Sequence, residues 1–130
     1  MVDPTGRYLL VVDMTGGDLY RLATAPDAAG PVRKVTLNGG DVVHGDGLDL
    51  VDHTLRVAHN AVNTVSRWTV SDDYATATLV EQFTDESLAI PTTLVRAGDR
   101  TLVVASQFDK GGPMSPGTPA TPFRIVAVRI

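Results

Sequence analysis

The chain has 130 residues, of which 43% are hydrophobic and 20% charged, a composition typical of one folded domain with its own core. Its formal net charge of −4, without a basic cluster, argues against a nucleic-acid partner, because phosphate contacts need gathered Lys and Arg. The absence of cysteine excludes disulfides, thiolate metal sites and cysteine nucleophiles. No apolar run approaches the roughly 18 residues of a membrane span, and no signal peptide is visible. We therefore expect no membrane partner, and a cytoplasmic location is only the default.

Short β-rich runs dominate from the first residues on. Residues 7–13 and 18–22 are strand-like and flank a loop with two glycines, which is typical of a hairpin. Residues 32–37 are interpreted as an outer strand. Further strands are predicted at 47–51, 54–59, 63–70, 76–83, 91–97, 101–106 and 123–129. Since no segment longer than ten residues has apolar spacing of 3.6, the predicted fold class is all-β.

The chain repeats itself at about 46 residues. Leu9 and Val11 correspond to Leu55 and Val57, and then, with one extra residue, to Leu102 and Val104. A period of this length in short strands is close to that of a four-stranded antiparallel propeller blade. We predict about three blades of a six-bladed β-propeller, forming a single unit over 1–130. The blade-like repeats cover about 2–43, 44–88 and 89–130, with a loop insertion at 107–122 that is rich in Pro and Gly.

Three blades do not close a ring, so the outer faces of the first and last blades would expose apolar side chains. Another polypeptide must cover these faces, or the sequence is a piece of a longer parent. We expect the partner to be a second copy of this chain, forming a homodimer, or the N-terminal half of a propeller. Two copies related by a two-fold axis would give six blades.

Two short sequence motifs resemble those of a known family. Residues 45–48 (Gly-Asp-Gly-Leu) resemble an axial strand of the gluconolactonase/regucalcin group of six-bladed propellers, and residues 3–9 resemble the Asp-Pro-x-Gly-x-x-Leu phrase of that group. The chain is similar to the C-terminal half of such a propeller. The resemblance implies a sugar-lactone hydrolase with a divalent metal, calcium or zinc, held on the axis by a Glu, two Asn and an Asp. Only Asp46 matches one of these ligands, and it would serve as metal ligand, catalytic base or both.

Other candidate binding residues surround Asp46. Thr92 occupies the equivalent position one blade later and is a poor metal ligand. His44, Asn60 and Asn63 lie in loops that are expected at the same end of the central channel of the propeller as Asp46. Asn is also common in tight turns, and a structural role is the alternative for His44. The missing ligands favour an alternative function, a non-catalytic binding or assembly module that self-associates to complete the ring.

Overall fold

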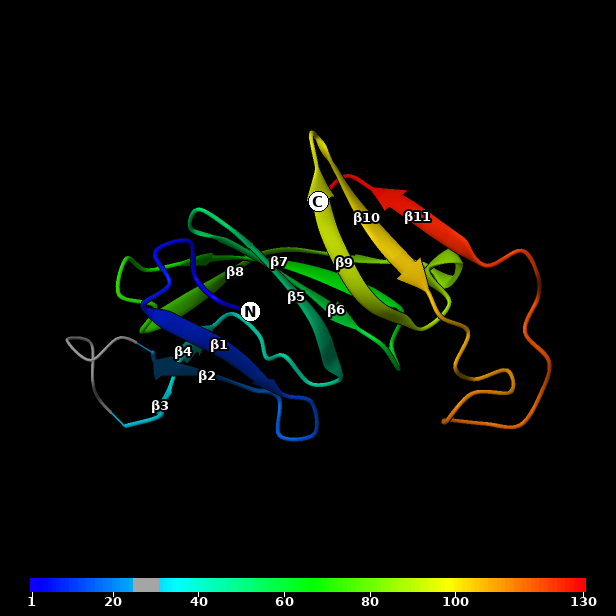
Figure 1. The fold of residues 1–130 in the computed structure, drawn as a ribbon, viewed down its shortest axis with the longest axis horizontal. Coiled ribbons are helices and arrows are strands. Elements are labelled where there is room, and N and C mark those ends of the chain that lie inside the picture. The colour runs from blue at the N-terminus through cyan, green and yellow to red at the C-terminus, as the bar shows by residue number, and fades with distance from the viewer. Residues whose placement is uncertain (25–30) are drawn as a thin grey trace.

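A computed structural model describes residues 1–24 and 31–130, which form three sheets that follow one another along the molecule (Figure 1). The first sheet has the order β1 (Tyr8–Asp13), β2 (Asp18–Ala23), β3 (Arg33–Lys34). The middle sheet contains β5 (Gly45–Val51), β6 (Thr54–His59), β7 (Thr64–Val70), β8 (Thr76–Thr84) and, at its outer edge, β4 (Thr36–Asn38). The last sheet has the order β11 (Arg124–Val128), β10 (Arg100–Ala105), β9 (Pro91–Ala97).

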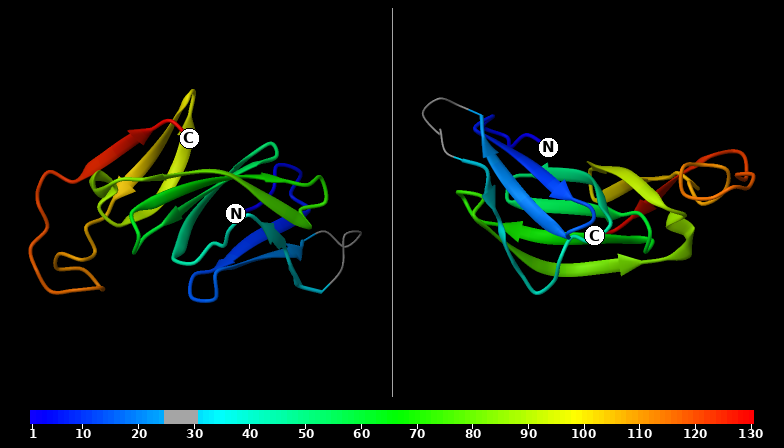
Figure 2. Two further views of the ribbon diagram at one scale, coloured as in Figure 1. Left: turned by 180° about the vertical axis from the view of Figure 1, so that it is seen from behind. Right: turned by 90° about the horizontal axis from the view of Figure 1, so that it is seen from below.

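The all-β prediction is confirmed, since the described helical structure is a single 3₁₀ turn, η2 (Glu86–Leu88). No described helix is long and apolar enough to cross a membrane. The last sheet and its long loop lie at the opposite end of the molecule from the first sheet (Figure 2). That loop follows a fixed path, because the Gln107 side chain donates to Ala120 O and accepts from Ala120 N, both at 2.9 Å.

The predicted outer strand at 32–37 is wrong as a single element. Residues of β3 pair with β2, whereas β4 runs parallel to β8 in the middle sheet. Val35, between the two, is 1% exposed and belongs to the core between the sheets. Burying Val35 therefore turns the chain away from the first sheet and carries it to the edge of the next.

Two cores hold the three sheets together, one at each seam. In the first, Leu10 and Leu19 of the first sheet share a cluster with Leu55, Val57 and Trp68 of the middle sheet. The second cluster joins Ala58 and Val65 of the middle sheet to Leu94, Val103 and Val128 of the last sheet. The strands β6 and β7 are therefore buried on both faces, whereas each end sheet is covered on one.

The predicted extra residue in the third repeat is also wrong. Val103 is fully buried against the middle sheet, whereas Val104 is partly exposed. The plain offset of about 46 residues, which aligns Val57 with Val103, gives both valines the same orientation toward the preceding sheet. A slip of one residue moves every side chain of a strand to the other face, so burial decides between the two alignments.

Candidate functional site at the start of the inner strand

Asp46 lies near the start of β5, the edge strand of the middle sheet that contacts β1 and β9 and that we call the inner strand, between two glycines that have no room for a side chain. A Cβ on Gly47 would lie 2.6 Å from Thr93 Cα and 2.7 Å from Thr92 O. A Cβ on Gly45 would lie 2.7 Å from Val42 O. These close approaches place the backbone around Asp46 beside the backbone of Thr92. The middle sheet and the last sheet therefore contact each other next to the Asp46 carboxylate.

Within the described part of the chain, the carboxylate of Asp46 is hydrogen-bonded by the side chain of Asn60. Asn60 Nδ2 donates to Asp46 Oδ2 at 3.4 Å, and Asn60 itself is 8% exposed. The amide is held from behind, because Asn60 Oδ1 accepts from Ala61 N at 2.6 Å and Asn60 N donates to His44 O at 2.9 Å. The loop after β6 thus fixes an amide against a half-buried carboxylate.

One side of Asp46 borders a hollow of about 320 Å³. Its lining is otherwise apolar: Met1, Leu9, Leu10, Val11, Val12 and Leu48. A single carboxylate beside an apolar wall suits a small cyclic ligand that presents a polar reactive group to Asp46 and the C–H face of its ring to the wall.

The remaining predicted site residues have structural contacts. His44 adopts φ 61°, and its backbone N–H donates to Met14 O at 2.8 Å, as in a tight turn. Asn63 Oδ1 accepts from Ile90 N at 2.7 Å, which ties the loop after β6 to the start of the last sheet. The structure therefore brings Asp46 and Asn60 side chains together, places the Thr92 backbone next to them, and uses His44 and Asn63 to shape the loops.

A buried hydrogen-bond chain behind this site was not predicted from the sequence. Trp68 Nε1 donates to Ser66 Oγ at 2.7 Å, and Ser66 Oγ lies 2.7 Å from His59 Nε2. Because Val43 O can only accept, His59 Nδ1 carries a proton and donates to it at 2.8 Å. Burial lowers the pKa of His59 and so favours the neutral ring. In that ring Nε2 accepts, and Ser66 Oγ donates its own proton to Nε2.

This histidine makes stability depend on pH. Its pKa lies below the ordinary 6.5 when folded, so the unfolded chain binds the proton more readily, and acid favours unfolding. We expect the free energy of unfolding to fall as the pH drops from 7.5 to 5.5, measured by urea denaturation. Carboxylates with lowered pKa, such as Asp3 and Asp85, act below roughly pH 4 and do not interfere in this window. A His59→Gln variant should be less stable at pH 7.5 and should lose less stability than the wild type across the same range. The remaining pH dependence comes from the Met1 ammonium, because burial also lowers its pKa from the ordinary 8.0. An equal slope in both proteins would contradict this role.

The site does not by itself fit a divalent metal ion. Within 1–24 and 31–130, no three His, Asp or Glu side chains are grouped to hold one. Asn60 turns its amide nitrogen toward Asp46, and its oxygen is already bonded to Ala61 N. Calcium commonly takes six to eight oxygen ligands, and one carboxylate is far from that number.

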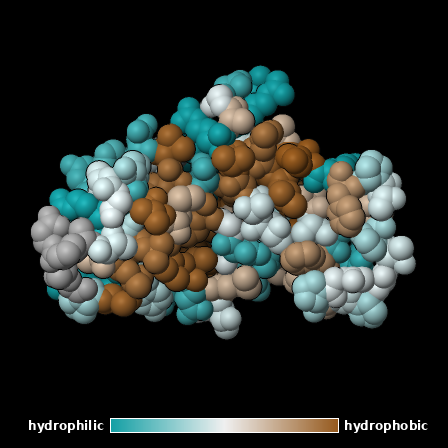
Figure 3. All heavy atoms as spheres, in the orientation of Figure 1, coloured by the Kyte–Doolittle hydropathy of each residue, from teal (hydrophilic) through white to brown (hydrophobic). Residues whose placement is uncertain are grey.

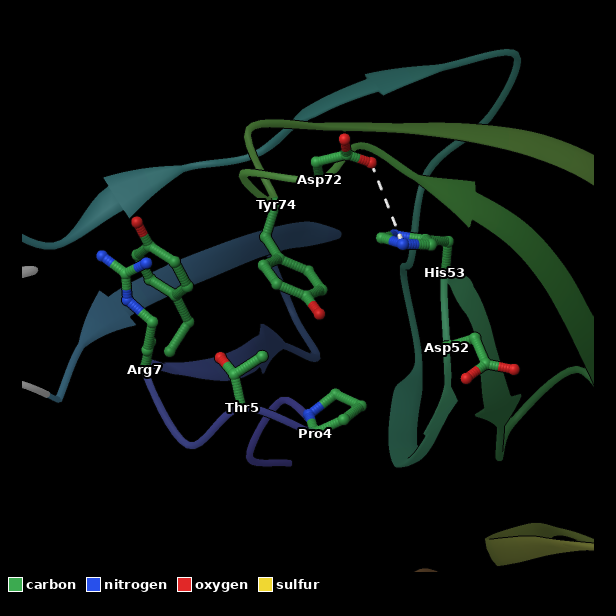
Figure 4. Close-up of a pocket in the computed structure, with 8 residues that line it drawn as sticks. Pro4, Thr5, Arg7, Asp52, His53, Asp72 and Tyr74 are labelled. Carbon is green, nitrogen blue, oxygen red and sulfur yellow. Dashed lines mark ion pairs between the residues drawn. The ribbon is translucent and has the colours of Figure 1, made fainter.

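A larger hollow, of about 450 Å³, lies at the other end of β5 (Figure 4). Asp52, which lines it, lies roughly 20 Å along the chain from Asp46 at about 3.3 Å per residue of strand. Its ion pair, His53 Nε2 to Asp72 Oδ1 at 3.8 Å, joins two exposed side chains and is worth little in water. Tyr74 reaches into this hollow, and burial raises the pKa of its hydroxyl. A carboxylate and an amide that are hydrogen-bonded to each other are found instead at the Asp46 end of β5.

Together, the repeat, the three successive sheets and the inner strand that carries Asp46 define an arc of a β-propeller. The luciferin-regenerating enzyme, a solved propeller chain, superimposes on it with a TM-score of 0.55 at 14% sequence identity. The match covers 99% of this chain and 44% of that one, so the chain spans less than half the length of the solved propeller. No protein-family model and no curated protein matches the sequence. At 14% identity, this structural similarity shows the fold alone.

Proposed function

We propose that the chain forms part of a propeller hydrolase that opens small sugar-type lactones, with Asp46 as the carboxylate that activates water. The observation that carries this proposal is the half-buried Asp46 at the inner strand, held by Asn60 and open to an apolar hollow. The resemblance of residues 45–48 and 3–9 to gluconolactonase-type phrases supports the substrate class.

In the proposed reaction, Asp46 accepts a proton from a water molecule as the water oxygen attacks the lactone carbonyl carbon. The resulting oxyanion collapses, the ring carbon–oxygen bond breaks, and the departing alkoxide takes the proton, which yields a hydroxy acid. Asn60 keeps the carboxylate oriented through its 3.4 Å hydrogen bond. A calcium or zinc ion would need further ligands from the blades that complete the ring.

Replacing Asp46 with asparagine tests this role. The change keeps the size of the side chain and removes the base, so hydrolysis should fall by about 100-fold or more. We would measure acid release from a panel of five- and six-membered sugar lactones, using the assembled protein with and without added calcium or zinc.

The matched control is Asp52→Asn, at the other end of the same strand, which should leave the rate unchanged. Equal rates for the wild-type and Asp46→Asn proteins would contradict the proposal, as would a complete lack of hydrolysis by the assembled protein.

A second candidate, a non-catalytic binding module, is favoured by one specific observation. Thr92 stands where the next blade would supply a ligand, and the described residues include no three-ligand cluster. Under this alternative, a lactone or polyol would bind saturably in calorimetry without being consumed. In addition, Asp46→Ala would leave the thermal stability unchanged with and without calcium.

A further inference from the structure

The last sheet turns an apolar face to solvent. We call it the trailing face; it consists of Val95, Leu102, Val104, Ile125 and Ala127. The strand register places these residues opposite one another, with Leu102 between Val95 and Ala127 and with Val104 beside Ile125. Val95 is 53% exposed and Ile125 is 66% exposed. Brown side chains gather over this sheet in Figure 3.

The first sheet has an apolar outer face of its own. This leading face consists of Leu9, Val11, Tyr20 and Leu22, in which Leu9 pairs with Leu22 and Val11 with Tyr20. Val11 is 39% exposed, and a second brown region covers the first sheet in Figure 3. The arc therefore has one uncovered apolar face at each end.

The repeat shows what such faces pack against. Leu9, Val11 and Leu22 correspond at about 46 residues to Leu55, Val57 and Trp68, which are fully buried against the first sheet. At the next seam, the corresponding side of the last sheet packs against Ala58 and Val65 of the middle sheet. Each internal seam thus joins the leading side of one sheet to the trailing side of the sheet before it. Of the two uncovered faces of the arc, one is a leading face and the other is a trailing face.

We propose that a second copy of this chain covers both faces at once. The trailing face of each copy packs on the leading face of the other about a two-fold axis, which closes the ring without leaving a free face. Two such arcs approach the length of the solved propeller, since one arc matches 44% of it. The net charges of the two segments that would meet have opposite signs, because residues 89–130 carry a net charge of +3 and residues 2–43 a net charge of −1. This arrangement also brings the two Asp46 residues to one channel.

Light scattering on the purified chain tests the proposal. We expect about twice the monomer mass of 13.8 kDa. Ile125→Glu on the trailing face and Leu9→Glu on the leading face should each give a monomer that keeps its β circular-dichroism signal, because each change places a charge in both seams. The control, Val80→Glu at a 47% exposed position of β8, should remain a dimer.

Mixing the two monomeric variants gives the sharper result. In a mixed pair, both charges fall in one seam and the other seam is wild type, so the mixture should regain dimer that neither variant forms alone. A clean wild-type monomer at every concentration would overturn the proposal, as would a dimer unaffected by Leu9→Glu. The Asp46→Asn protein should remain a dimer, so a failure of the proposed activity and a failure of this assembly are distinguishable.

Discussion

Replacing Trp68 with alanine is expected to lower the free energy of unfolding by about 3–5 kcal/mol. Trp68 is fully buried between the first and middle sheets and is among the largest side chains of the core. Its loss leaves a cavity and also removes the donor to Ser66, which supports His59. Both consequences destabilise the same seam.

Urea denaturation followed by circular dichroism measures this loss, provided that the slope with denaturant stays constant. Val32→Ala is the matched control, because Val32 is 58% exposed and should cost less than about 0.5 kcal/mol. A loss below about 1 kcal/mol for Trp68→Ala would show that the seam between the first two sheets is not packed as described.

Removing Asp49 should be comparably damaging. Asp49 and Arg56 are 7% and 6% exposed, and Asp49 Oδ2 lies 3.8 Å from Arg56 Nη1. Within the described part of the chain, neither of these two atoms has a hydrogen-bond partner. Burial lowers the pKa of Arg56, while the Asp49 carboxylate acts in the opposite direction. Asp49→Ala leaves this guanidinium without its counter-charge, and we expect a loss of about 3–5 kcal/mol.

A double-mutant cycle separates the pair from its surroundings. The cycle consists of Asp49→Leu, Arg56→Met and the double variant. The double variant should recover most of the stability that each single variant loses, because it removes both buried charges together. Thr101 Oγ1 would still donate to Ile130 O at 3.4 Å after the Arg56 Nε bond to that oxygen is lost. Purely additive losses in the double variant would contradict a coupled buried pair.

Much of the fold follows from local pattern. Alternating apolar residues and short turns predict β5 to β11 to within about two residues, because these strands are buried by their immediate neighbours in each sheet. The division of 32–37 into β3 and β4 could not be predicted this way, since it depends on Val35 reaching a core formed with another sheet. The register of β10 likewise needed the burial of Val103.

The site was predictable in outline only. The alternation of strand direction places Asp46 and Asn60 at one end of the central channel. In the structure, Asn60 Nδ2 lies 3.4 Å from Asp46 Oδ2. No spacing in the sequence indicates that His59 turns inward to Ser66, because that contact depends on how β6 pairs with β7. The use of Asn63 to hold Ile90 N is similarly a contact between sheets that local pattern does not report.

The central claim is that this chain is an open arc whose middle sheet is covered on both faces and whose end sheets are covered on one. Amide hydrogen exchange of the wild-type and Ile125→Glu proteins tests it most directly, because exchange reports local opening sheet by sheet. In the monomeric variant, β6 and β7 should remain slow while β1, β2, β10 and β11 exchange quickly, and all three sheets should be protected in the wild type. Uniform protection of the three sheets in a monomer would contradict the account.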